Sequence, residues 1–249
     1  MEWYFIPALI GAGILCGFIN TLAGSGSLIS LPLLMFMGLP ANVANGTNRV
    51  AILLQNIVGV SSFKKQKVFK ISEGIWLAIP AILGSLLGAS MAISLNEEIM
   101  TKVIGGLLVF MFFIILLKPD AWIKGQAGLI RSKPNLLQIV IFFFIGIYGG
   151  FIQAGVGFFL LAGLVLGTGF DLVKANAIKL LIVLLYTPFA LAIFIYNDQV
   201  YWIAGLILGV GNMIGAFVAS RFAVSWGAKA VRIILLIIVF GASLKLLLT

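Results

Sequence analysis

The chain has 249 residues, of which 62% are hydrophobic and 9% are charged. Soluble domains are roughly half apolar and one quarter charged, so this composition excludes an ordinary water-soluble domain and predicts an integral membrane protein. The net charge of +9 does not indicate a nucleic-acid partner, because the Lys and Arg residues gather in short loops between apolar runs, where such residues set orientation in a membrane.

The apolar runs predict an all-α integral membrane protein. A helix needs about 20 apolar residues to cross the hydrocarbon, so the chain has room for about eight to ten segments. We count five segments in each half, and the second of each five is short, which predicts one short or broken helix pair per half. The segments cover approximately residues 4–20, 27–37, 43–63, 75–95 and 99–117, then 136–152, 158–166, 172–195, 201–222 and 230–248.

This division predicts a first membrane repeat over residues 1–118, a cytoplasmic linker over 119–135 and a second membrane repeat over 136–249. The first run carries Glu2 where a secretory signal has Lys or Arg, and it lacks a small-residue cleavage pattern, so we expect a retained membrane segment. The single Cys16 excludes an intramolecular disulfide and a cysteine metal cluster. We expect no metal and no other cofactor.

The two halves of the chain are similar to each other in sequence. Transporters are often internal duplications, which appear as weak symmetry of this kind. One copy has two residues fewer than the other. The matching stretches are residues 23–26 with 154–157, 44–45 with 175–176, and 84–89 with 211–216.

Charges in equivalent loops predict that the two halves are inverted. Lys and Arg accumulate on the cytoplasmic side of a membrane. The loop at 64–70 is rich in Lys while its counterpart at 196–199 is not, and the acidic stretch at 96–98 has a basic counterpart at 221–232. This swap requires an odd number of crossings per half, and five satisfies it. We therefore expect an inverted repeat in the cell membrane, with both termini extracytoplasmic.

Four repeated glycines mark the expected substrate site. Gly24, Gly26, Gly155 and Gly157 lie where a short apolar segment begins, so they can open a turn inside the membrane and expose backbone N–H groups that favour anions. Irregular backbone is tolerated at membrane depth only inside protein or beside a cavity, and transporter sites recur at such broken helices. The alternative is that these glycines only permit close helix packing.

Polar side chains near the turns could donate hydrogen bonds to an oxyanion. The candidates are Ser25 and Gln153 beside the turns, and Asn45, Thr47, Asn48 and Asn176 on the following segments. The alternative is that the Asn and Thr side chains cap helix starts or bond neighbouring helices together. For Asn45 and Asn176 capping is an equal alternative. Gln55, Asn56, Tyr186, Thr187 and Asn212 are further polar residues inside apolar segments, with the same two interpretations.

Arg49 and Lys179 are cations inside predicted membrane segments. A cation at the bilayer centre costs about 3 kcal/mol and usually marks a functional site. In the inverted topology Arg49 approaches the site from outside and Lys179 from inside, which suits an anion path. Alternatively, these long side chains extend to the membrane surface without any ligand role.

The sequence resembles the sulfite exporter TauE/SafE family, also called the toluene sulfonate uptake permeases. The resemblance is carried by the AGSGS stretch at 23–27, Pro32, the GLP at 38–40 and the ANGTN stretch at 44–48, and it extends over almost the whole chain. It implies a permease for sulfur-containing or organic anions such as sulfite, sulfonates or sulfoacetate, often driven by the proton gradient. The second copy departs from the pattern at 176–179 (NAIK), where the family more often has Gly-Thr. The resemblance therefore supports a binding role more strongly for the first half than for the second.

Together these features predict a secondary transporter that moves a small anion by alternating access around a midplane site between the repeats. An anion channel is the alternative. The chain has no G-x-x-x-x-G-K-S/T pattern for an ATP-driven pump, and without His or paired buried carboxylates we expect neither an enzyme nor catalytic residues. The expected partners are the anion, the lipid bilayer and a proton as candidate coupling ion. The oligomeric state cannot be derived from these patterns.

Overall fold

The computed structural model describes residues 5–96, 98–99 and 134–247, with side chains between residues 6 and 226 of these ranges. All regular secondary structure in these ranges is helical, which confirms the predicted all-α class. The predicted segment at 99–117 and the predicted linker at 119–135 lie almost entirely outside the described residues.

Two helix pairs fold back on themselves at the glycine turns. Helix α1 (Phe5–Leu22) is followed by α2 (Ser27–Phe36), and a Cβ on Gly26 would overlap the carbonyl of Cys16, so α2 returns along α1. Gly24 between them has a φ of +80°, a conformation that glycine adopts without steric cost. The first predicted short pair is therefore a helical hairpin.

The second hairpin contains α6 (Leu136–Phe151), α7 (Val156–Ala162) and η3 (Gly163–Gly167), a π-helical continuation of α7. Gly155 opens this turn with a φ of +71°. Near the start of α6, Gln138 Nε2 donates to the Gly167 carbonyl oxygen at the end of η3 over 2.8 Å. The open end of this helical hairpin is therefore held together by a hydrogen bond between α6 and the end of η3.

The remaining helices are α3 (Ala41–Lys65), α4 (Ile71–Ile93), α8 (Leu172–Tyr196) and α9 (Trp202–Leu247). Among the described residues, three stretches are long and apolar enough to cross a membrane, judged by length and composition: Ile71–Ile93, Leu172–Tyr196 and Trp202–Trp226. This number is below the predicted eight to ten because residues 100–133 lie outside the described part of the chain, the hairpin helices are individually shorter, and α3, although long, is rich in polar residues. One helix also spans the predicted segments 201–222 and 230–248, since no Pro interrupts that stretch.

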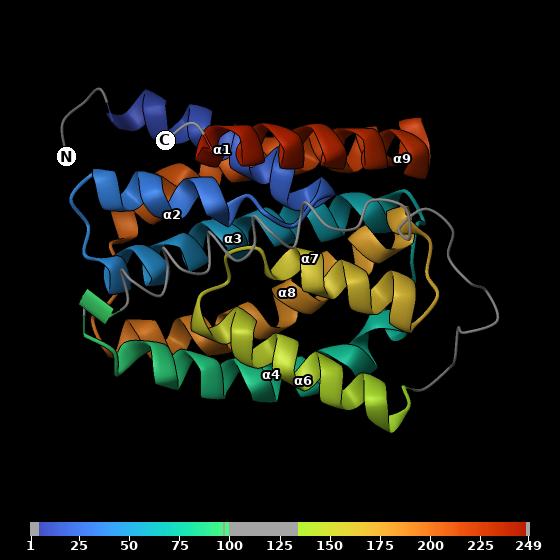
Figure 1. Ribbon diagram of the computed structural model, residues 1–249, viewed down its shortest axis with the longest axis horizontal. Coiled ribbons are helices and arrows are strands. Elements are labelled where there is room, and N and C mark those ends of the chain that lie inside the picture. Colours follow the sequence, from blue (N-terminus) through green and yellow to red (C-terminus); the bar gives the residue numbers. More distant parts are fainter. Residues whose placement is uncertain (1–4, 97, 100–133, 248–249) are drawn as a thin grey trace.

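The fourth long helix of each predicted half packs against the opposite half. Helix α9 lies along α1 and α3, and α4 lies along α6 and α8. Figure 1 shows α1, α2 and α9 on one side of the molecule and α4 and α6 on the other, with α3 and α8 between them. We call the group α1, α2, α3 and α9 the upper bundle and the group α4, α6, α7, η3 and α8 the lower bundle. Each bundle thus combines helices from both halves of the chain.

Small residues make these exchanged contacts close. A Cβ on Gly84 or Gly88 would overlap the α6 carbonyl of Phe143 or Ile147, respectively. The corresponding glycines of α9, Gly211 and Gly215, meet the α1 carbonyls of Ile10 and Ile14 in the same way. Helices that touch through glycine bring their backbones together, as small residues do in membrane bundles.

The outward face of α4 is apolar. Leu83, Leu87 and Met91, spaced by four residues, are 56%, 52% and 55% exposed, whereas Gly84 and Gly88 face α6. A contiguous apolar face of this kind is unusual on a soluble monomer and fits contact with lipid. This supports the integral membrane assignment made from composition.

Gly88→Ala is expected to destabilise the protein. The new methyl group would overlap the Ile147 carbonyl, and overpacking of a close contact costs about 1–3 kcal/mol. The measurement is thermal unfolding in detergent. Gly11→Ala is the matched control, since a Cβ there meets nothing within 4 Å. An unchanged melting temperature for Gly88→Ala would contradict the close α4–α6 contact.

Candidate functional site

The two glycine turns touch each other between the bundles. The Gly157 N–H donates to the Gly24 carbonyl oxygen over 3.2 Å, and a Cβ on either glycine would overlap the other backbone. The structure therefore brings together the turns that the sequence singled out in each half. Close backbone approach is the immediate reason for glycine at these two positions.

A small cavity lies beside this contact, with a volume of about 10 Å³. This is close to the minimum volume that one buried water molecule needs. Residues from α1, α3, both turns, α7 and α8 line it: Asn20, Gly24, Asn56, Gln153, Val156, Gly157, Lys179, Leu180 and Val183. Of the predicted site residues, Gly24, Gln153, Gly157 and Lys179 therefore line one common cavity.

Lys179 on α8 holds the end of α1 from across the bundle interface. Its Nζ donates to the carbonyl oxygens of Asn20 and Thr21, over 2.9 and 3.0 Å, and to Asn176 Oδ1 over 2.7 Å. These three acceptors match the three N–H donors of an ammonium group. Because α1 ends at Leu22, its last carbonyls carry the partial negative charge of a helix C-terminus, which attracts a cation.

Arg49 on α3 makes the reciprocal contact with the end of α6. Its Nη1 donates to the Gly149 carbonyl oxygen over 3.0 Å and to Gln153 Oε1 over 3.1 Å. Its Nη2 donates to the Gly150 carbonyl oxygen over 2.5 Å and to Asn45 Oδ1 over 3.5 Å. Arg49 is fully buried and reaches the cavity only through Gln153, which lines it.

Both cations are buried, so the alternative that they extend to the membrane surface is wrong in this structure. Lys179 is 1% exposed and Arg49 0%. Each stands on the long helix after one hairpin and binds the C-terminal carbonyls of the first helix in the other hairpin. The positions are not equivalent in the repeat, since Asn176 lies three residues before Lys179 and Asn45 four before Arg49.

Several buried polar atoms at this site have no hydrogen-bond partner within the described part of the chain. The donors among them are Gln153 Nε2, Asn176 Nδ2 and Arg49 Nε, and the Tyr186 hydroxyl is likewise unpaired. Asn56, which lines the cavity, has an unpaired Oδ1. An unpaired buried polar atom costs free energy, and such groups in native proteins call for an explanation such as a ligand or water.

The other predicted polar residues join helices together. Asn45 Nδ2 donates to the Phe151 carbonyl oxygen over 2.8 Å. Asn48 accepts from Ser30 Oγ over 2.7 Å and donates to Ser27 Oγ over 3.1 Å, which ties α3 to α2. Thr47 Oγ1 accepts from the Tyr201 N–H over 2.8 Å. None of these three side chains lines the cavity.

The capping alternative is wrong for Asn45 and Asn176. Helix α3 begins after Pro40 without a side-chain cap, and Asp171 caps α8 by accepting from the Val173 and Lys174 N–H groups. Asn45 and Asn176 instead accept from Arg49 and Lys179. Of the remaining predicted residues, Ser25 and Gly26 are buried in the first turn and Gly155 forms the second turn, all outside the cavity lining.

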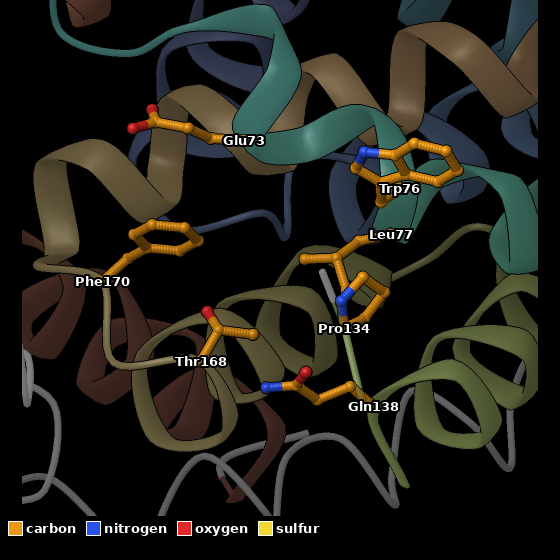
Figure 2. A pocket seen from close by; sticks show the side chains of 7 residues that line it. All are labelled: Glu73, Trp76, Leu77, Pro134, Gln138, Thr168 and Phe170. Atoms are coloured by element: carbon orange, nitrogen blue, oxygen red, sulfur yellow. The ribbon is translucent and has the colours of Figure 1, made fainter. Parts of the chain in front are cut away.

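A second cavity, of about 20 Å³, lies near the start of α4 and α6 and contains none of the predicted site residues. Figure 2 shows it between Trp76, Leu77 and Pro134 on one side and Thr168 and Phe170 on the other, with Gln138 at its lower edge. Its charged lining residue, Glu73, accepts a hydrogen bond from Lys174 Nζ over 2.8 Å. None of the described residues that line this cavity is a cation.

The comparisons with known proteins agree with the membrane assignment. A family model described as "Sulfite exporter TauE/SafE" matches residues 9–246. A "Probable membrane transporter protein ORF9" from Sinorhizobium sp is 27% identical over 99% of this chain and 94% of its own length. The "Probable membrane transporter protein YfcA" of Escherichia coli (strain K12) is 28% identical over 97% of this chain and 90% of its own length. No solved structure matches the chain.

Arg49→Met is expected to destabilise the protein strongly. The substitution removes the donors to the Gly149 and Gly150 carbonyls and to two side chains, and each stranded buried group costs about 1–3 kcal/mol. The measurement is thermal unfolding in detergent.

Arg221→Met is the control, because Arg221 is exposed and stacks on Phe217, and surface substitutions usually change stability by less than about 0.5 kcal/mol. Equal melting temperatures for the Arg49 and Arg221 variants would contradict the structural role of Arg49.

Proposed function

The chain belongs to the sulfite exporter TauE/SafE family and is a membrane transporter, and we propose that it is a secondary permease for small oxyanions. The proposed substrates are sulfur-containing oxyanions or organosulfonates, such as sulfite. The proposed binding site is the cavity beside the two glycine turns, where Lys179, Gln153 and Asn176 contact the anion.

The unpaired donors at the cavity are the observation that carries this proposal. The Nε2 of Gln153, which lines the cavity, is buried without a partner in the described region, and so is the Nδ2 of Asn176, which lies outside the lining and accepts from Lys179. Lys179 brings a positive charge to the same cavity. Hydrogen bonds to a charged group contribute more than those to a neutral group. An oxyanion would satisfy the two amide donors and neutralise the ammonium charge, and a cation would do neither.

The packing of the helices supports an inverted repeat. The contact of Gly88 with Ile147 corresponds to that of Gly215 with Ile14. The two cations likewise bind the helix ends of opposite hairpins. Such reciprocal contacts are expected when two similar halves are related by a twofold axis in the membrane plane. With the basic loop at 64–70 inside, this arrangement has both termini outside the cell membrane.

Alternating access would then occur between the upper and lower bundles rather than between the two sequence halves. Each bundle holds a hairpin, the long helix that follows it, and the fourth helix of the other half. Lys179 reaches from the lower bundle to α1, and Arg49 reaches from the upper bundle to α6. The proposed site lies on this interface, where transporter sites are expected.

An anion channel is the second candidate. It would use the same polar residues, but it needs a continuous path that stays open, and the cavity holds about 10 Å³. A space this small favours a carrier that opens to one side at a time over a permanently open path.

Sulfite or another sulfur oxyanion is expected to raise the melting temperature of the purified protein and to enter proteoliposomes saturably. A ligand that binds only the folded state stabilises it in proportion to occupancy. The compounds to compare are sulfite, thiosulfate, sulfoacetate, taurine and acetate. Saturation separates a carrier from a channel.

Gln153→Met is expected to raise the KM of uptake about tenfold or more, because a hydrogen bond to a charged group contributes about 1.5–3 kcal/mol and about 1.4 kcal/mol is tenfold. Gln66→Met is the matched control, since the Gln66 amide bonds Ser62 and Ser220, away from the cavity lining. Stabilisation by acetate alone, or equal KM values for the two variants, would count against the oxyanion site.

A further inference from the structure

Lys179 is the one ionisable side chain among the residues that line the central cavity. The cavity walls from α1, α3, α7 and both turns contribute amides, glycines and Val156, and no carboxylate. Other ionisable side chains buried on surrounding elements of the described region are Arg49, which bonds Gln153 in the cavity wall, Tyr186 on α8 itself and Cys16 on α1. No carboxylate therefore balances the charge of Lys179 within the cavity.

The surroundings of Lys179 accommodate its amine in either protonation state. As an ammonium it donates to Asn20 O, Thr21 O and Asn176 Oδ1. As a neutral amine it has two N–H groups and a lone pair, so it can keep two of these bonds. The neutral form also removes an unpaired charge from a buried position, where a charge without a partner is costly.

Arg49 cannot exchange a proton in this way. A guanidinium stays protonated in proteins, whereas a buried lysine amine readily changes its protonation state. The Arg49 guanidinium also donates to two α6 carbonyls, and its Cζ lies 4.6 Å from the centroid of the Phe194 ring in a cation–π contact. The two reciprocal contacts thus combine one permanent cation and one cation that can titrate.

We propose that Lys179 carries the coupling proton of transport. When the cavity opens to one side, the amine takes a proton from H₃O⁺, which leaves a water molecule, and the ammonium binds the anion. When it opens to the other side, the anion leaves and the ammonium returns its proton to water, which gives the neutral amine and H₃O⁺. The carrier then reorients with Lys179 neutral. One proton thus moves with each anion, in the same direction.

This inference rests on the proposed function, and the test separates the two. Purified protein is reconstituted in liposomes that contain a trapped pH indicator, with methanesulfonate as the probe because it remains a monoanion across neutral pH. Net uptake driven by an inward proton gradient is measured beside exchange of labelled for unlabelled methanesulfonate at equal pH. In the wild type, uptake is expected to acidify the lumen by one proton per anion.

Lys179→Arg is expected to keep exchange, since the loaded carrier still crosses, and to lose proton-driven net uptake to the level of protein-free liposomes, since arginine does not release its proton. Lys174→Arg is the matched control, being the same change on the same helix at a residue that pairs with Glu73 outside the cavity. It is expected to keep both activities.

A second measurement covers the case in which Lys179→Arg fails to fold. Reductive methylation with formaldehyde modifies neutral amines, so Lys179 in the wild type is expected to react when the anion is absent and to be protected by methanesulfonate. Lys174 should react equally in both conditions. Peptide mass spectrometry reads the result.

Three results would overturn the proposal while leaving the transporter in place. They are saturable uptake without acidification, proton-driven uptake by Lys179→Arg at the wild-type rate, and methylation of Lys179 that the anion does not change. Absence of saturable uptake of both methanesulfonate and sulfite by the wild type would instead overturn the proposed function itself, and this inference with it.

Discussion

The structure depends on how two helices can end inside the protein. The last carbonyls of α1 and α6 have no partner within their own helices, and at membrane depth water is not available to bind them. Lys179 and Arg49 donate to these carbonyls from the opposite bundle, and the Asn20 carbonyl also accepts from the Gly24 N–H. The same two contacts bring both glycine turns together. As a result Lys179, which binds the end of α1, also lines the polar cavity beside the turns.

The sequence predicts the parts of this site that rest on residue type. Gly24 and Gly157 stood out because the glycine turn is repeated in both halves, and Gln153 and Lys179 because amides and cations are rare inside apolar segments; all four line one cavity. The sequence could not show that Arg49 binds the end of α6 rather than the cavity, or that the Asn45 amide bonds the Phe151 carbonyl. These contacts join residues about one hundred positions apart and depend on packing. The sequence also gives no sign that the cavity is lined by Val156, Leu180 and Val183, because apolar residues occur throughout such a chain.

The exchange of α4 and α9 between the halves constrains how the molecule can move. Their contacts with α6 and α1 run through glycines at backbone distance, and interlocked surfaces of this kind resist sliding. The α3–α8 interface, in contrast, holds the polar and charged side chains that can change partners. A hinge between the bundles also separates apolar residues, since one apolar cluster joins Ile52 and Phe63 of α3 to Ile178 and Ile182 of α8, whereas separation of the sequence halves would open both glycine interfaces at once.

The contact between the turns is the weakest part of that interface in chemical terms. It consists of one N–H to carbonyl bond of 3.2 Å between Gly157 and Gly24, neither of which has a side chain. A cavity of about 10 Å³ fits a water molecule and is too small for an oxyanion with several heavy atoms. Enlargement beside this bond requires its loss and a displacement of Val156 and Val183, which form the adjoining apolar wall. Glycine at both positions thus closes the site by backbone contact, with no side chain of its own at the point of contact.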